Sequence, residues 1–172
     1  MRVADTRPAL DSRRLSTIFL MSFCRKPDSA DFPLAEVDYV QASALDTLRA
    51  VFPHIHEEIV GKRVIDFGCG RGYQAIAYAL AGAKSVVGVE INAVLGQMSA
   101  ARVAQYGLAD KVRIERELTD EIPGDMIVSL NSFEHFIEPE MILPRLRNSL
   151  APGEKIYINF GPPWYAPTGA LL

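Results

Sequence analysis

Hydrophobic and polar positions follow two different periods along the chain. In residues 36–52 the apolar side chains recur every three or four positions, which predicts an amphipathic helix that ends before Pro53. Beyond residue 62, short apolar runs are bounded by glycine and polar residues, which is typical of buried parallel strands. Five such strands are predicted: residues 64–67, 85–89, 112–115, 126–130 and 155–160.

The segments between these strands predict helices. One spans residues 73–81, a second runs to residue 105 with Asn92 as its cap, and a third starts at Pro139 and ends near residue 150. Residues 54–62 are expected to form a polar connector, and Pro152-Gly153 is expected to form a turn. Strands that alternate with helices indicate an α/β fold with a doubly wound, mostly parallel sheet and helices on both faces. Such sheets bind ligands at the carboxyl ends of their strands.

Composition narrows the class of protein. The 172 residues suffice for one domain, and a formal net charge of −3 does not favour nucleic-acid binding. Two cysteines are too few for a disulfide scaffold, so a reduced, cytoplasmic protein is expected. No apolar run is long enough to cross a membrane. Residues 1–35 are expected to be an N-terminal extension before the domain at 36–172, because prolines and mixed charges there leave no sustained period. The apolar stretch 15–23 is short and lacks a following cleavage site, so it is not expected to be an export signal.

The segment after the first predicted strand carries most of the chemistry. Gly68, Gly70 and Gly72 leave the backbone uncrowded where a strand turns into a helix, so a ligand can approach the main chain. Glu90 lies 18 residues beyond Gly72, at the end of the next predicted strand. A carboxylate there can accept hydrogen bonds from both hydroxyls of a ribose. The loop and the acid together indicate binding of an adenine nucleoside.

Two details distinguish among the nucleoside ligands. The dinucleotide fingerprint requires glycine at position 73, where this chain has Tyr73, and no Lys-Ser or Lys-Thr pair follows the loop. Asp66 places an acid two residues before the first glycine. A negative charge there suits a ligand with an ammonium and a sulfonium group and disfavours a pyrophosphate.

With these motifs the sequence resembles the class I methyltransferases that use S-adenosylmethionine. The resemblance covers residues 36–165 and rests on five blocks in the family's order: 64–72, 86–90, 125–129, 133–136 and 150–154. It implies a Rossmann-like sheet with strand order 3-2-1-4-5, S-adenosylmethionine as cofactor and methylation of an acceptor. Acidic charge, compact length and the block 133–136, which contains Glu134 and His135, favour a small-molecule acceptor.

The resemblance also implies roles for single residues. Asp66, Gly68 and Gly70 would cradle the methionine part of the cofactor. Glu90 would hold the ribose and Ile91 would flank the adenine. The rest of the loop, Cys69 and Gly72, is also expected at the cofactor, with Cys69 as a packing residue and not a nucleophile.

Two further cofactor contacts follow from the family pattern. The acid near the adenine amine follows the third strand, where the loop 115–120 offers several acids and Glu117 is chosen. Asn131, after the fourth strand, would lie beside the sulfonium.

Glu134 and His135 lie where an acceptor would be expected. Some family members that methylate hydroxyls hold a metal with such a pair, but their pattern has another acid where this chain has Asn131, so no metal is expected. The pair therefore stays open as catalytic or structural. Methyl transfer needs a base only if the acceptor loses a proton near the transition state. Trp164 and Tyr165 follow the fifth strand and are either lining of the acceptor pocket or ordinary loop packing.

The chain departs from the family at its end. The family's sheet usually has seven strands, and only five are predicted here. The fifth would then be an exposed edge. Truncation is the favoured explanation, with pairing to another subunit in a homo-oligomer, or cover by residues 15–23, as alternatives.

The sequence thus predicts a methyltransferase that uses S-adenosylmethionine and acts on a small molecule, with no nucleic-acid or membrane partner. Two alternatives remain: a module that binds the cofactor or its product without transferring a methyl group, and a nucleotide-dependent oxidoreductase.

Overall fold

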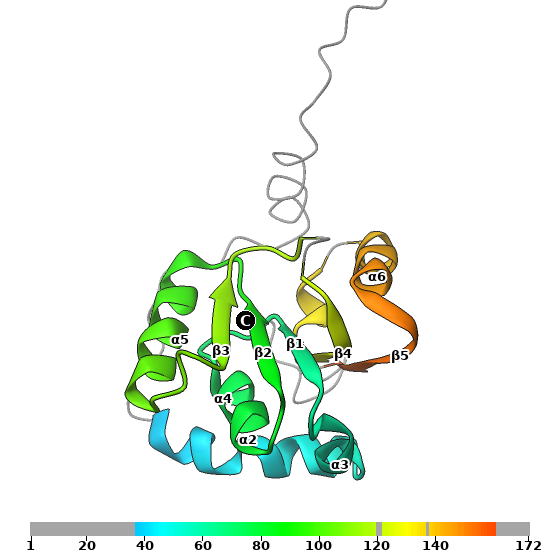
Figure 1. Ribbon diagram of the computed structural model, residues 1–172. Helices are drawn as coiled ribbons and strands as arrows, with labels where there is room; N and C mark the ends of the chain where they lie inside the picture. Colours follow the sequence, from blue (N-terminus) through cyan, green and yellow to red (C-terminus); the bar gives the residue numbers. More distant parts are fainter. Residues whose placement is uncertain (1–36, 120–121, 137, 161–172) are drawn as a thin grey trace, which may run out of the picture.

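The computed structural model describes residues 37–119, 122–136 and 138–160, and within them a single five-stranded sheet with the order β3-β2-β1-β4-β5 (Figure 1). All four strand pairs are parallel. The predicted strand order is therefore confirmed. The strands are β1 (Arg63–Phe67), β2 (Ser85–Val89), β3 (Val112–Glu115), β4 (Gly124–Leu130) and β5 (Leu150–Asn159). The predicted N-terminal extension, Trp164 and Tyr165 lie outside the described residues.

The sheet has a core on each face because successive side chains of a strand point to opposite sides. On one face, Val64 of β1 packs with buried side chains of α2 (Val37–Val51), α3 (Ile55–Ile59), α4 (Tyr73–Leu80) and α5 (Ala93–Gln105). On the other face, Ile65 packs against α6 (Pro139–Asn148) and the segment after β3. Helices thus cover both faces, as the alternation of strands and helices predicts. None of the helices in the described part of the chain is long and apolar enough to span a membrane.

The helix ends follow the local sequence. Asn92 accepts hydrogen bonds from the backbone N–H groups of Val94 and Leu95, at 2.9 and 3.3 Å, and so caps α5 as predicted. Pro139 occupies the first turn of α6, and Pro144 lies inside that helix. A short 3-10 helix, η2 (Phe133–His135), follows β4.

Residues 54–62 differ from the prediction. They contain the helix α3 and are not only a polar connector. Ile55 and Ile59 are 1% and 0% exposed, because residues four apart on a helix share a face and this face meets the core. The five residues of α3 are too few for the hydrophobic period to reveal the helix in the sequence.

The predicted turn at Pro152-Gly153 is also corrected. This dipeptide lies within β5, where the pairing partner of β4 shifts from Leu150 opposite Gly124 to Lys155 opposite Met126. The intervening residues bulge out of the ladder, and Gly153 has φ +90°, which glycine adopts readily. The strand therefore starts earlier than the apolar run 155–160 indicates. β5 is an edge strand of the described sheet.

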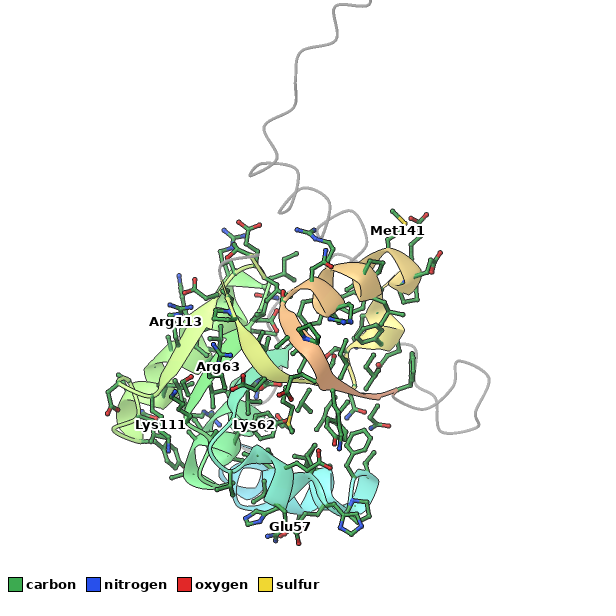
Figure 2. The ribbon with its side chains drawn as sticks, turned by 45° about the vertical axis from the view of Figure 1, so that its right-hand side comes forward. Glu57, Lys62, Arg63, Lys111, Arg113 and Met141 are labelled. Carbon is green, nitrogen blue, oxygen red and sulfur yellow. The ribbon has the colours of Figure 1, made fainter. Side chains whose placement is uncertain are left out.

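Charged groups join the ends of the strands that lie away from the glycine loop, and Figure 2 labels two of them, Lys62 and Arg63. Arg63 donates from Nη2 to Oδ1 of Asp125 at 2.6 Å and from Nε to Oδ2 at 3.0 Å. Hydrogen bonds from Arg63 lower the pKa of the Asp125 carboxyl to about 2. Lys62 bonds both carboxylate oxygens of Glu154, each at 3.0 Å. These bonds tie the start of β1 to the starts of β4 and β5.

Candidate cofactor site

The glycine loop after β1 needs glycine for its backbone shape. Gly68, Gly70 and Gly72 have φ angles of +82°, +52° and +81°. A side chain at Gly68 would overlap Ser132, and one at Gly72 would overlap Ser99. At Gly70 a Cβ atom would meet nothing within 4 Å. The loop therefore packs against Ser132 and Ser99 at its two ends, and its middle glycine, Gly70, faces open space.

Glu90 lies across from this loop, at the end of β2. Its Oε2 accepts a hydrogen bond from the backbone N–H of Gly70 at 2.8 Å, and its Oε1 accepts one from Asn92 N–H at 2.8 Å. The side chain is 9% exposed. Burial raises the pKa of the carboxyl, and the two backbone N–H groups partly offset that rise. A carboxylate oxygen has two lone pairs, so each can accept a further hydrogen bond from a ligand.

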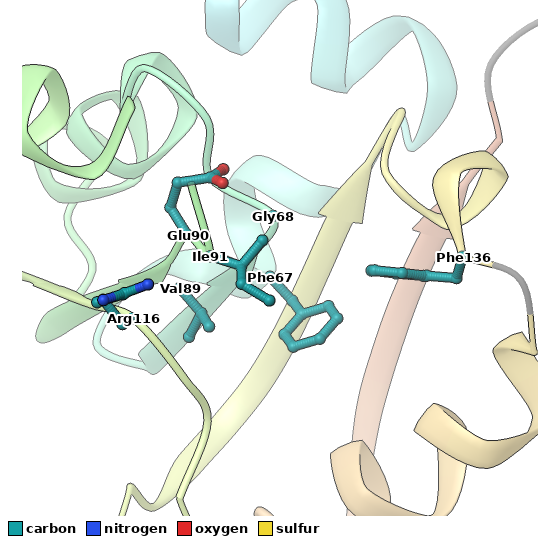
Figure 3. Close-up of a pocket in the computed structure, with 7 residues that line it drawn as sticks. All are labelled: Phe67, Gly68, Val89, Glu90, Ile91, Arg116 and Phe136. Carbon is teal, nitrogen blue, oxygen red and sulfur yellow. The ribbon is translucent and has the colours of Figure 1, made fainter. Parts of the chain in front are cut away.

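A hollow of about 330 Å³, which includes space open to solvent, lies at this end of the sheet (Figure 3). It is lined by Phe67, Gly68, Val89, Glu90, Ile91, Arg116 and Phe136. Three predicted cofactor residues, Gly68, Glu90 and Ile91, thus meet in one hollow. Arg116 and Phe136 lie at its two opposite sides, and sequence reasoning did not assign either of them to the site.

Asp66 lies beneath the loop and is not among the residues that line the hollow. Its side chain is 2% exposed, and Oδ2 is buried without a hydrogen-bond partner. Burial, together with the nearby charge of Glu90, raises the pKa of Asp66 to about 7, while the backbone N–H of Ala75 opposes the rise. The contact of Asp66 with the methionine part of a cofactor stays a prediction.

Cys69 packs inside the loop. It is 4% exposed and carries a free thiol whose pKa is raised by burial. Its side chain closely approaches Gly88 of β2, where a Cβ atom would lie 2.8 Å from the sulfur. A buried, protonated thiol is a poor nucleophile, so this geometry agrees with a packing role.

The segment after β3 places Arg116 at the hollow, and the contact of Glu117 with the adenine amine stays a prediction. Arg116 lines the hollow, whereas the predicted Glu117 is not among the lining residues. The only signal for Arg116 in the sequence was its place directly after the third strand.

The turn after β4 holds the remaining predicted residues. Asn131 has φ +50°, and its Oδ1 accepts a hydrogen bond from Asn159 Nδ2 at 3.1 Å. Neither Asn131 nor the next predicted pair, Glu134 and His135, lines the hollow. His135 is exposed, and Oε2 of Glu134 is buried without a hydrogen-bond partner. Among the residues that the structure describes, no three His, Cys, Asp or Glu side chains gather as a metal site.

Phenylalanine rings continue from the hollow toward the end of β5. Phe136 lies 5.7 Å from Phe67 and 5.2 Å from Phe133, measured between ring centroids. Phe133 in turn lies 6.0 Å from Phe160, which is 60% exposed. We call Phe67, Phe133, Phe136 and Phe160 the aromatic row. Of the four, Phe67 and Phe136 line the hollow, and Phe133 is 2% exposed and packs between Phe136 and Phe160.

A parallel sheet of this order, with a glycine loop after β1 and an acid after β2, defines a Rossmann-like nucleoside-binding domain. A family model described as "Methyltransferase domain" matches residues 38–160. The chain belongs to this family.

Similar curated proteins include two with different acceptors in their names. The chain is 30% identical to a ribosomal protein L11 methyltransferase of Photobacterium profundum over 60% of this chain and 35% of that protein. It is 30% identical to a ubiquinone biosynthesis O-methyltransferase of Chromobacterium violaceum over 67% of this chain and 51% of that protein. The chain thus spans about a third to a half of the length of these two relatives.

Solved structures share the fold. A protein described as a putative S-adenosyl-L-methionine-dependent methyltransferase, from Methanococcus maripaludis, superposes with a TM-score of 0.59 at 21% identity, over 80% of this chain and 68% of that chain. The [4+2]-cyclase SpnF superposes with a TM-score of 0.55 at 21% identity, over 78% of this chain and 48% of that chain. At such identities the similarity concerns the fold alone.

Proposed function

We propose that the protein transfers a methyl group from S-adenosylmethionine to a small-molecule acceptor. The observation that carries the proposal is the position of Glu90. Its carboxylate ends β2, closes against the glycine loop through Gly70 N–H at 2.8 Å, and lines the hollow. A carboxylate at that place in a parallel sheet suits the two hydroxyls of a ribose.

The other residues of the hollow fit the rest of this cofactor. Gly70 leaves open space over the loop, so a ligand can lie close to the main chain. Val89 and Ile91 offer apolar surface beyond Glu90, as a purine base requires. S-adenosylmethionine supplies a methyl group already activated by its positive sulfur, so the chain needs no nucleophile of its own.

The chain's own task is then to align the acceptor and exclude water. Phe67 and Phe136 line the hollow on the side of β1 and β4, and the aromatic row extends this apolar wall. We propose that the acceptor binds along the row. An apolar wall suits a small molecule with a hydrophobic body better than a charged lysine of a protein.

His135 and Glu134 are the candidates for acceptor chemistry. His135 is exposed on the short helix that precedes Phe136, so an acceptor bound beside Phe136 can reach it. A neutral imidazole there could accept a proton from an acceptor hydroxyl. We propose that Glu134 positions the acceptor. Its buried Oε2 makes no hydrogen bond within the described structure and so has a lone pair left for a donor on the acceptor.

A calorimetric titration with S-adenosylhomocysteine tests the cofactor. Glu90→Ala should weaken binding about tenfold or more, because charged hydrogen bonds to the ribose are lost. The control is Glu115→Ala, which removes the same side chain from the neighbouring strand end, where it pairs with Arg113 at 2.9 Å. Glu90→Gln keeps the shape and should also weaken binding. A folded chain that does not bind S-adenosylhomocysteine would refute the proposal, and binding of NAD would favour an oxidoreductase.

The acceptor class is tested with methyl-labelled S-adenosylmethionine and a cell extract divided by filtration. Label in the low-mass fraction is expected, and label confined to the protein fraction would contradict a small-molecule acceptor. Phe160→Ser should raise the KM for the acceptor and leave the Kd for S-adenosylhomocysteine unchanged, because Phe160 lies at the exposed end of the aromatic row.

A second candidate function is binding of the cofactor without methyl transfer. It is favoured by the cyclase among the structures that share this fold, since that fold is not confined to proteins named as methyltransferases. Tight binding of S-adenosylhomocysteine with no label in either fraction would support this second function.

A further inference from the structure

Arg116 is the one charged side chain besides Glu90 that lines the hollow. It follows β3 directly and is exposed. Within the part of the chain that the structure describes, its guanidinium makes no hydrogen bond or ion pair. Arg113, three residues earlier and labelled in Figure 2, instead pairs with Glu115 at 2.9 Å. An unpaired guanidinium at the wall of a ligand site is free to contact the ligand.

The strand order decides which part of the ligand Arg116 would meet. At the carboxyl end of the sheet the strands run β3, β2, β1, β4. The glycine loop follows β1, and Glu90 follows β2. A ligand with its amino-acid part on the loop and its ribose on Glu90 must therefore direct its base toward β3. Figure 3 shows Arg116 on that side of Glu90, opposite to Phe136.

We propose that Arg116, and not Glu117, holds the purine base of the bound nucleoside by contact of its guanidinium plane with the base. This inference rests on the proposed function. A guanidinium is planar and weakly hydrated, and it stacks on aromatic faces in a way that a lysine ammonium does not. Ile91 lines the same hollow and offers an apolar surface for the base. The exocyclic amine of adenine donates hydrogen bonds, and a carboxylate could accept one. A guanidinium has no acceptor, so Arg116 would contact the face of the base and not its amine.

Calorimetric titration of the full chain with S-adenosylhomocysteine tests the proposal. Arg116→Ala should weaken binding about three- to tenfold. Arg116→Lys should recover less than half of that loss on a logarithmic scale, because lysine keeps the charge and loses the plane. Arg113→Ala, on the strand that precedes Arg116, is the matched control, and Glu117→Gln tests the competing residue. Both should stay within about twofold of the unaltered chain.

A second ligand shows which part of S-adenosylhomocysteine Arg116 contacts. With 5′-methylthioadenosine, which lacks the amino-acid part, Arg116→Ala should cause the same fold loss as with S-adenosylhomocysteine. A loss seen only with S-adenosylhomocysteine would place Arg116 on the ligand's carboxylate and overturn the proposal. Arg116→Ala within twofold of the unaltered chain, a larger loss for Glu117→Gln, or full binding by Arg116→Lys would also overturn it.

These outcomes differ from failure of the proposed function. If the unaltered chain binds S-adenosylhomocysteine and Arg116→Ala binds it equally well, only the role of Arg116 is refuted. If the unaltered chain is folded and binds neither ligand, both proposals are refuted. Arg116 is exposed and makes no ion pair with the described residues, so its variants should have the same thermal midpoint as the unaltered chain.

Discussion

The carboxylate of Glu90 and the backbone N–H of Gly70 form a 2.8 Å hydrogen bond between the end of β2 and the loop after β1. This bond holds the glycine loop in place from the neighbouring strand. Since Gly70 has φ +52° and faces open space, the same contact keeps the loop clear for a ligand. The group that would bind the ribose therefore also shapes the loop.

Gly70→Ala should separate ligand binding from folding. The new Cβ atom meets no protein atom within 4 Å and would occupy space that the cofactor needs. A left-handed backbone costs alanine about 1 kcal/mol, so the folded chain should survive. Gly107→Ala is the control, because it has φ +65° and equally open surroundings. We expect calorimetry to show lost S-adenosylhomocysteine binding for the first variant only, and equal loss in both would argue against a ligand over the loop.

Asp66 should make stability depend on pH. Its pKa is about 7 in the folded chain, against about 4 for an unfolded aspartate. The folded state therefore binds this proton more tightly, and the free energy of unfolding should fall as pH rises from about 4 to about 7. Asp66→Asn keeps an oxygen for Ala75 N–H and has no proton to lose, so it should be more stable than the unaltered chain at pH 8 by about 1–3 kcal/mol.

Urea unfolding between pH 4.5 and pH 8 measures this effect. The difference between Asp66→Asn and the unaltered chain should shrink toward pH 4.5. Asp110→Asn is the control, because Asp110 is exposed. A difference that stays constant over the whole pH range would mean that Asp66 does not titrate there.

Asp125 should contribute to stability through its bonds to Arg63. Removing the carboxylate in Asp125→Ala loses the two guanidinium bonds and the bond from Arg63 N–H at 2.9 Å. We expect the thermal midpoint at pH 7 to fall by a few degrees. Folding lowers the pKa of Asp125 to about 2, so its contribution is present above about pH 4 and lost as pH falls toward 2.

Asp46→Ala is the control for this ion pair. Asp46 pairs with Arg49 at 3.5 Å on the surface of α2, and its side chain is 73% exposed. Such exposed pairs contribute little. Equal thermal midpoints for Asp125→Ala and Asp46→Ala would show that the Arg63–Asp125 bonds do not stabilise the fold.

Tyr157 should anchor β5 to α3 through its hydroxyl. It donates a hydrogen bond to Glu58 at 2.5 Å, and its ring packs edge-on against Phe52 at 5.1 Å. Tyr157→Phe keeps the ring contact and should cost about 1 kcal/mol of unfolding free energy. Tyr157→Ala loses both contacts and should cost more, and chemical denaturation with equal losses for both variants would show that the ring contributes nothing.

Much of the sheet could be predicted from the sequence because β1 and β2 are short and apolar, and each is followed by glycine or an acid. Val64 to Phe67 and Ser85 to Val89 fall within the observed strands. The edge strand β5 was predicted too short, since residues 151–154 bulge out of the ladder and carry no apolar signal. Ile55 and Ile59 were missed as core residues because a single helical turn has no readable period.

The site divides in the same way. The sequence by itself determined the glycine loop and Glu90, because positive φ angles demand glycine and a strand end fixes where an acid must lie. Only the tertiary structure decided that Arg116 and not Glu117 faces the hollow, that Asp66 is buried beneath the loop, and that Phe136 completes the wall. These three depend on the direction of a side chain relative to a neighbouring strand. That direction is set by packing between segments far apart in the chain, which local sequence does not encode.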